Sequence, residues 1–177
     1  MSNALLYRMP VGIAGAISRP QDLTVEPVII NAANPFSAYG LAGKFVDGLF
    51  VPLADGDAVS VIQGIYVRPY PTTSTPDLVR QVGADKNFAG DALKRGYMSV
   101  NVGSDATAIT TGAVVYVVVS LDSSFDVPLG GFMAHLTNGK TVALPNSQLT
   151  GPGHADGNAD ISYMRVGPIM STFEQTP

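Results

Sequence analysis

The sequence contains no cysteine and no tryptophan, and it is poor in charged residues. Without cysteine, the chain has no disulfide, no zinc–thiolate site and no cysteine nucleophile. Charged residues make up only 14% of the chain, against roughly 25% in an ordinary soluble domain. Glutamate occurs only at Glu26 and Glu174, and lysine occurs only four times. Because both residue types favour exposed helices, their scarcity predicts a chain made of sheets and loops.

Clustered positive charge and long apolar runs are also missing. The net charge is −4 and the isoelectric point is about 4.9, which disfavours broad binding to nucleic acid, because neutralising phosphates needs clustered lysine and arginine. The longest uninterrupted apolar run lies near Ala113–Val119, far short of the roughly 20 residues that a membrane-spanning helix needs. We therefore expect neither nucleic acid nor a membrane as a partner.

Turn-forming residues are abundant by contrast, with 19 glycines and 13 prolines. The dipeptides Asp47-Gly48 and Asn138-Gly139 each lie between two apolar runs, and each predicts a β-hairpin with a two-residue turn. Thr24–Ile30 is rich in β-formers, and Pro27 restricts it to an edge strand or a bulge. The near-continuous valines of Ala113–Leu121 predict a strand that is buried on both faces.

These signals together predict an all-β fold of roughly seven to nine short strands, without any helix longer than two turns. The expected architecture is a β-barrel or jelly-roll-like sandwich with an extended N-terminal arm. We expect the arm to span residues 1–22, the body residues 23–166 and a C-terminal tail residues 167–177. The arm has few charges but several apolar side chains that need a surface to lie on, namely Leu5, Leu6, Tyr7, Met9, Val11, Ile13 and Ile17.

Candidate catalytic and metal-binding residues are few. His135 and His154 are the only histidines, and no Gly-x-Ser-x-Gly motif occurs in the chain. The segment 156–160 alternates oxygen-bearing side chains as calcium loops do, but it lacks the EF-hand spacing, and turn formation explains it. The segment 12–15 lacks the third glycine of a dinucleotide-binding loop. We therefore expect no enzyme, no metal and no cofactor, with a small β-rich hydrolase as an alternative.

Arginine stands close to tyrosine at three places in the chain. Both residue types anchor many protein interfaces, through bidentate hydrogen bonds and stacking. The alternative is that these arginines are solvated, with their stems lying over apolar surface. The candidate residues for an interface with another protein chain, taken from the arm and from these pairs, are Tyr7, Arg8, Met9, Pro10, Ile13, Arg68, Tyr70, Arg95 and Tyr97.

The shortage of charge also bears on the surface of the body. Ten basic and fourteen acidic side chains would be spread over roughly 8,000 Å² of surface, the area expected for this mass. Such a sparse distribution is typical of a protein whose faces are covered by other chains. A neutral β-domain rich in serine and threonine, soluble on its own, is the alternative.

Several short motifs follow one another along nearly the whole chain. They include Tyr7-Arg8-Met9-Pro10, Gly64-Ile65-Tyr66-Val67-Arg68-Pro69-Tyr70-Pro71, Leu93-Lys94-Arg95-Gly96-Tyr97-Met98 and Asp156-Gly157-Asn158. In this order they resemble the structural cement, or decoration, proteins of tailed bacteriophage capsids. No catalytic motif accompanies that resemblance.

The resemblance implies a non-enzymatic protein on the outer surface of the virion capsid, made in the host cytoplasm. Its implied partners are the major capsid protein and other copies of itself, as a homodimer or homotrimer. The implied function is to bind an icosahedral head across the seams between capsomers and to stabilise it against the pressure of packaged DNA. A receptor- or glycan-binding β-domain on a virion surface is the alternative, and the lack of tryptophan and low aromatic content argue against it.

Overall fold

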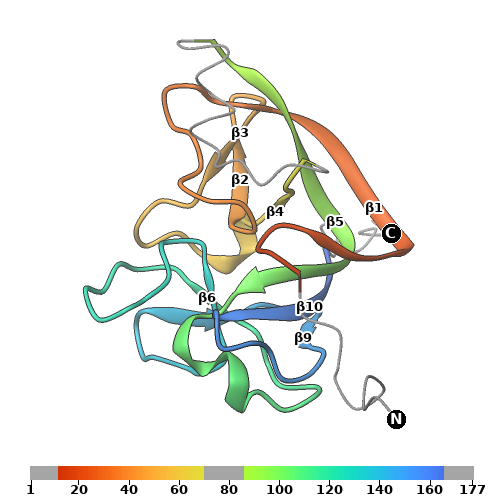
Figure 1. Cartoon of the computed structure of the whole chain (residues 1–177). Helices are drawn as coiled ribbons and strands as arrows, with labels where there is room; N and C mark the ends of the chain where they lie inside the picture. The colour runs from red at the N-terminus through yellow and green to blue at the C-terminus, as the bar shows by residue number, and fades with distance from the viewer. Residues whose placement is uncertain (1–11, 70–85, 166–177) are drawn as a thin grey trace, which may run out of the picture.

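The computed structural model describes residues 12–69 and 86–165, and these residues form an almost entirely β structure (Figure 1). Within them the longest helix is the six-residue 3-10 segment η3, so the predicted all-β class is confirmed. No described helix is long and apolar enough to span a membrane. The elements are β1 (Ile17–Ile30), β2 (Ala42–Val46), β3 (Leu49–Pro52), η2 (Val59–Val61), β4 (Gly64–Tyr66), β5 (Phe88–Asn101), η3 (Gly103–Ala108), β6 (Tyr116–Val118), β7 (Phe132–Met133), β8 (Thr141–Ala143), β9 (Ser147–Leu149) and β10 (Asn158–Met164).

Five strands close into a ring in the order β1-β3-β2-β4-β5, because β5 pairs again with β1. The hairpin between β2 and β3 is the one predicted at Asp47-Gly48, whose φ angles of 50° and 79° are those of a primed two-residue turn. The contact between β1 and β3 is parallel and rests on the pair Ile30 and Phe50. Closure of this kind removes most sheet edges, as in other β-barrels.

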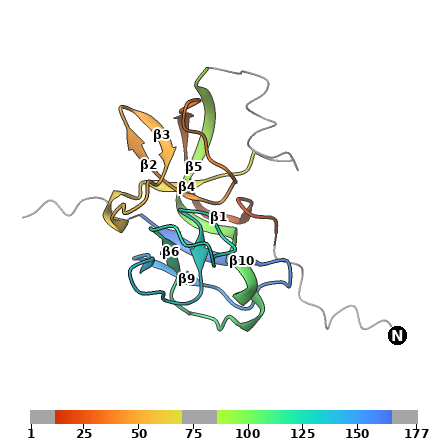
Figure 2. The same ribbon diagram turned by 90° about the vertical axis from the view of Figure 1, so that its left-hand side faces the viewer.

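The 14-residue strand β5 connects the two halves of the molecule (Figures 1 and 2). One of its edges pairs with β1, from Ile17 opposite Met98 to Ile30 opposite Phe88. Its other edge pairs first with β4 and then with β10, which in turn pairs with β9. A second sheet, in the order β7-β6-β8, lies in the lower half with β9 and β10.

Each half has its own apolar core. The ring encloses an aromatic cluster in which the centroid of Phe36 lies 5.1 Å from that of Phe50 and 4.7 Å from that of Tyr66. The larger core lies between β5, β10 and the second sheet, and it includes the fully buried Val117. The neighbouring Val118 is also buried, at 1% exposure, so the centre of the valine-rich segment is covered on both faces as predicted. The strand itself is shorter than Ala113–Leu121, since β6 has only three residues and Val114 and Leu121 are 46% and 60% exposed.

Two further strand predictions need correction. The strand expected over Thr24–Ile30 begins at Ile17, although the open outer edge of β1 agrees with the edge position that Pro27 predicted. The hairpin expected at Asn138-Gly139 does not form, because β7 and β8 each pair with β6 and not with one another. The apolar β6 lies between them, and burial of its valines outweighs the local turn signal.

Candidate interaction surface

The predicted interface residues fall into two groups. Tyr7, Arg8, Met9, Pro10 and Tyr70 lie outside the described residues. The other four lie at two separate places: Ile13 and Arg68 where the N-terminal segment meets the body, and Arg95 and Tyr97 on β5.

The N-terminal segment joins the body just before β1. The Gly15 amide donates to the carbonyl of Ser99 over 2.8 Å, and the Ser99 amide donates to the carbonyl of Ala16 over 2.9 Å. The Ala16 amide donates to the carbonyl of Ile13 over 3.0 Å, which closes a turn. Ile13 itself is 46% exposed. Residues 12–16, called the root below, precede the first residue of β1 and are therefore also attached to β5.

Arg68 holds the root from the opposite side. Its amide donates to the carbonyl of Gly15 over 2.8 Å, and its side-chain Nε donates to the carbonyl of Ala14 over 3.0 Å. Its guanidinium carbon lies 4.6 Å from the centroid of the Tyr39 ring. A half-buried arginine in this position uses its hydrogen-bond donors and its flat face at the same time.

Two glycines allow the root to approach the body this closely. Gly15 has a φ of 84°, and a Cβ there would lie 2.5 Å from the Cβ of Tyr39. Gly40 has a φ of 77°, and a Cβ there would lie 2.8 Å from the amide nitrogen of Gly15. Both positions require a left-handed backbone and free space, which only glycine satisfies together.

Arg95 and Tyr97 lie in a more exposed region of β5. The pairing of β1 with β5 is irregular between Arg19 and Thr24. Asp22 projects from this irregular stretch and pairs with Arg95 at 2.5 Å, with about half of each side chain exposed. The guanidinium of Arg19 covers the Tyr97 ring at 4.4 Å. Such exposed contacts contribute little to stability and remain open to solvent.

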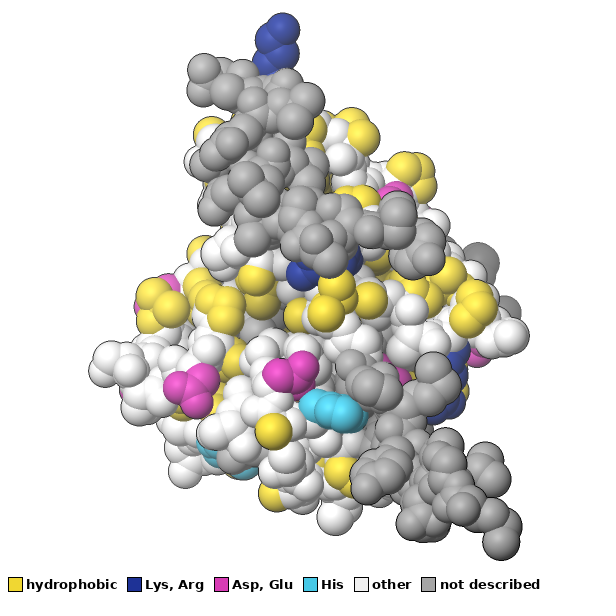
Figure 3. Space-filling view, viewed as in Figure 1, with side chains coloured by type: hydrophobic (Ala, Val, Ile, Leu, Met, Phe, Trp, Pro, Cys, Tyr) yellow, Lys and Arg dark blue, Asp and Glu magenta, His cyan; other side chains and the backbone are white. Residues whose placement is uncertain are grey.

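An apolar strip crosses four adjacent strands on the outside of the ring. Ile29 of β1 lies opposite Ala89 of β5, and Val46 of β2 lies opposite Leu49 of β3. The parallel contact between β1 and β3 places Ile29 beside Leu49, so the four side chains share one face. Ile29 and Val46 are each 46% exposed. Figure 3 shows further hydrophobic side chains in a band across the middle of the molecule.

The outer edge of β1 is protected against pairing with another strand. Among the described residues, only Ile30 of this strand pairs on the side away from β5. Pro20 and Pro27 have no amide hydrogen to offer there, and Arg19 and Glu26 add charge. Proline, charged side chains and irregular pairing are features that prevent the edge strand of a natural sheet from pairing with another chain.

Sequence reasoning missed one buried charged residue, Lys94. Its ammonium donates to the carbonyl of Gln63 over 2.6 Å and lies 3.3 Å from a carboxylate oxygen of Glu26. The Phe45 ring covers it at 4.9 Å. Burial lowers the pKa of Lys94, and the Glu26 carboxylate opposes that shift. Its neighbour Arg95 points outward, so only the alternation of the strand could have signalled this burial.

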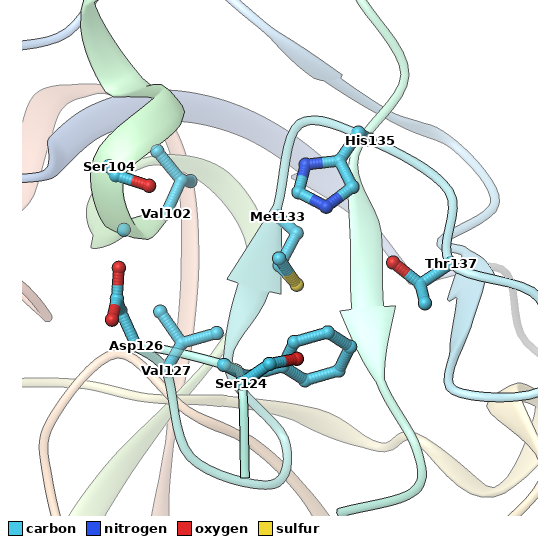
Figure 4. Close-up of a pocket in the computed structure, with 10 residues that line it drawn as sticks. Val102, Ser104, Ser124, Asp126, Val127, Met133, His135 and Thr137 are labelled. Atoms are coloured by element: carbon cyan, nitrogen blue, oxygen red, sulfur yellow. The ribbon is translucent and has the colours of Figure 1, made fainter. Parts of the chain in front are cut away.

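A pocket of about 220 Å³ lies next to η3, and one histidine and one aspartate are among the residues that line it (Figure 4). His135 and Asp126 lie on opposite sides of it, with Met133 between them. The hydroxyl of Ser124 donates to Asp122 over 2.8 Å. The Ser124 hydroxyl therefore gives its hydrogen bond to Asp122, a residue that does not line the pocket. In the part of the chain that the structure describes, no three acidic or histidine side chains are grouped to hold a metal.

Comparisons with known proteins agree with this picture of a structural protein. A chain from the solved structure "The capsid of Myoviridae Phage XM1" has the same fold, with a TM-score of 0.64 at 16% identity, and the match covers 93% of this chain and 98% of that chain. The search of curated proteins finds no match. The family model described as XM1 gp53 minor capsid protein matches residues 1–163. The chain therefore belongs to the XM1 gp53 minor capsid protein family, which makes it a structural component of a phage capsid.

Proposed function

We propose that this minor capsid protein acts as a cement. It binds the outer surface of the assembled head across the seams between capsomers, and it contacts the major capsid protein and neighbouring copies of itself. The observation that carries the proposal is a charge-poor surface on which ten large apolar side chains are exposed among the described residues, led by Leu121 at 60% and Leu136 at 55%. Exposed apolar surface of this extent is typical of a protein that other chains cover.

The physical mechanism is linkage between binding and assembly. A protein that binds only where two capsomers meet favours the assembled lattice over the separated subunits. An interface of roughly 1,600 Å² can supply micromolar to picomolar affinity. Packaged DNA would then have to break these contacts, repeated over the whole shell, before the capsomers could separate.

The N-terminal segment supplies a second means of attachment. The root is anchored to the body at residues 12–16, and we propose that residues 1–11, which precede it in the sequence, bind a neighbouring subunit. The family match includes these residues. An arm that adds its backbone to a partner's sheet gains hydrogen bonds without a large apolar core. The division into arm, body and tail stays a prediction, and we propose that the arm ends at the root and not at residue 22.

The test is co-sedimentation with capsid shells of its own phage assembled without this protein. We expect the full chain to bind the shells and to raise the temperature at which they dissociate. Deleting residues 2–11 should leave the body folded, by circular dichroism, and should weaken binding. A full chain that stays in solution as a monomer and ignores such shells would contradict the proposal.

A further inference from the structure

We propose that Arg68 is a positioning residue for capsid attachment, which fixes the place and direction in which residues 1–11 leave the body. This inference rests on the proposed function, since it assumes that those residues bind the shell. It changes the role expected for Arg68 from the sequence, where it was a candidate for direct contact with a partner.

The contacts of Arg68 carry this inference. One main-chain bond to Gly15 and one side-chain bond to Ala14 hold two consecutive carbonyls of the root, at 2.8 Å and 3.0 Å. The ring of Tyr39, at 4.6 Å, supports the guanidinium from behind. Arg68 is therefore engaged with its own chain on several sides and is only half exposed.

The close approach of the two glycines prevents the root from sliding. Gly15 lies between Tyr39 and Arg68, and Gly40 packs against the backbone of Gly15. The amide of Gly40 donates to the carbonyl of Tyr66 over 2.8 Å, so this support belongs to the ring. The root is held between Arg68 on one side and the loop before β2 on the other.

Fixing the root before binding should strengthen attachment. Each residue that must become ordered when a complex forms lowers the affinity of that complex by about fivefold to thirtyfold. Release of one root residue would then cost about tenfold in binding to the shell, with no partner contact removed. Arg95, on the exposed part of β5, pairs with Asp22 and not with the root, so its substitution should leave hydrogen exchange at Gly15 unchanged even where Arg95 contacts the shell.

The experiment compares Arg68→Ala and Arg68→Lys with Arg95→Ala, the matched control for hydrogen exchange at the root, each in the full chain. Binding to shells assembled without the protein is measured together with amide hydrogen exchange of the free protein. We expect Arg68→Ala to bind about tenfold more weakly, with exchange at Gly15 accelerated more than exchange at Val100 in β5, which follows global unfolding. Arg68→Lys keeps the charge but loses the planar fork, so it should lie between wild type and Arg68→Ala. Should Arg68→Ala fail to fold, Arg68→Lys serves for the same comparison.

A chain lacking residues 2–11 separates this inference from the proposed function. If that chain binds as well as wild type, the arm has no role and the proposed attachment fails. If it binds weakly, a further substitution of Arg68 should cause no additional loss, because the residue acts through the arm. An additional loss, or wild-type binding by Arg68→Ala with an intact arm, would overturn the positioning role.

Discussion

Arg68 and Arg95 begin as equivalent residues, each two positions before a tyrosine in the chain, yet the structure places them in opposite surroundings. Arg68 is half-buried, bonded to the root and stacked on Tyr39. Arg95 is half-exposed and pairs with Asp22 across an irregular stretch of β1. The difference shows that an arginine near an aromatic residue can serve the fold as readily as an interface, and only its surroundings decide which.

The largest expected effect concerns the packing beneath Arg68. Gly40→Ala and Gly48→Ala both place a side chain on a left-handed backbone, with φ angles of 77° and 79°. That conformation costs about 1–2 kcal/mol at either site. Only at Gly40 would the new Cβ also meet backbone, at 2.8 Å, whereas nothing lies within 4 Å of Gly48. We expect a loss of about 3 kcal/mol or more for Gly40→Ala, measured by urea denaturation. Equal losses for the two variants would show that the root does not pack tightly.

Arg68 itself should matter less than the glycine beneath it, but more than Arg95. Arg68→Ala removes a charge-assisted hydrogen bond and a stacked ring contact, together worth about 2–3 kcal/mol. Thermal or urea unfolding of the isolated protein measures this loss. A stability indistinguishable from wild type would mean that the contacts with Ala14 and Tyr39 contribute nothing in solution.

Lys94 sharpens the comparison. It directly precedes Arg95 on β5, but its side chain lies on the buried face of the strand and that of Arg95 on the exposed face. The pKa of Lys94 is lowered in the folded protein, chiefly by burial, from an ordinary value of 10.5. Between the lowered pKa and 10.5, the unfolded chain binds more protons than the folded one, so raising the pH favours folding. We expect the stability of wild type relative to Lys94→Met to rise across this alkaline window, as followed by urea denaturation at a series of pH values. Parallel pH profiles for the two proteins would count against a lowered pKa.

The smallest effect is expected at Arg95. Its ion pair with Asp22 is exposed on both sides, and such pairs contribute about 0–1 kcal/mol. Arg95→Ala should therefore change the free energy of unfolding by less than about 0.5 kcal/mol, and added salt should remove even that difference. A loss as large as that of Arg68→Ala would erase the distinction between the two sites.

Local signals succeeded where a segment's structure depends on its nearest neighbours. Asp47-Gly48 forms the expected hairpin because the backbone of its turn can be adopted by few other dipeptides. Asn138-Gly139 carries a similar signal and fails, since its flanking segments both pair with β6. The candidate interface residues divide in the same way. Their residue types predicted contacts, but not whether those contacts are made with their own chain or with a partner chain.

The sequence by itself determined the class of the protein: β-rich, poor in charge, without cysteine or a catalytic motif, and similar to phage capsid proteins. The β-rich class follows from composition, alternation and turn residues, which act over a few positions, whereas the likeness to phage capsid proteins rests on the ordered series of short motifs. Only the tertiary structure decided that five strands close into a ring, that Lys94 is buried while Arg95 is exposed, and that Arg68 reaches Ala14 across 54 positions of the chain. Contacts between distant segments depend on how whole strands pack, and no local pattern encodes that choice.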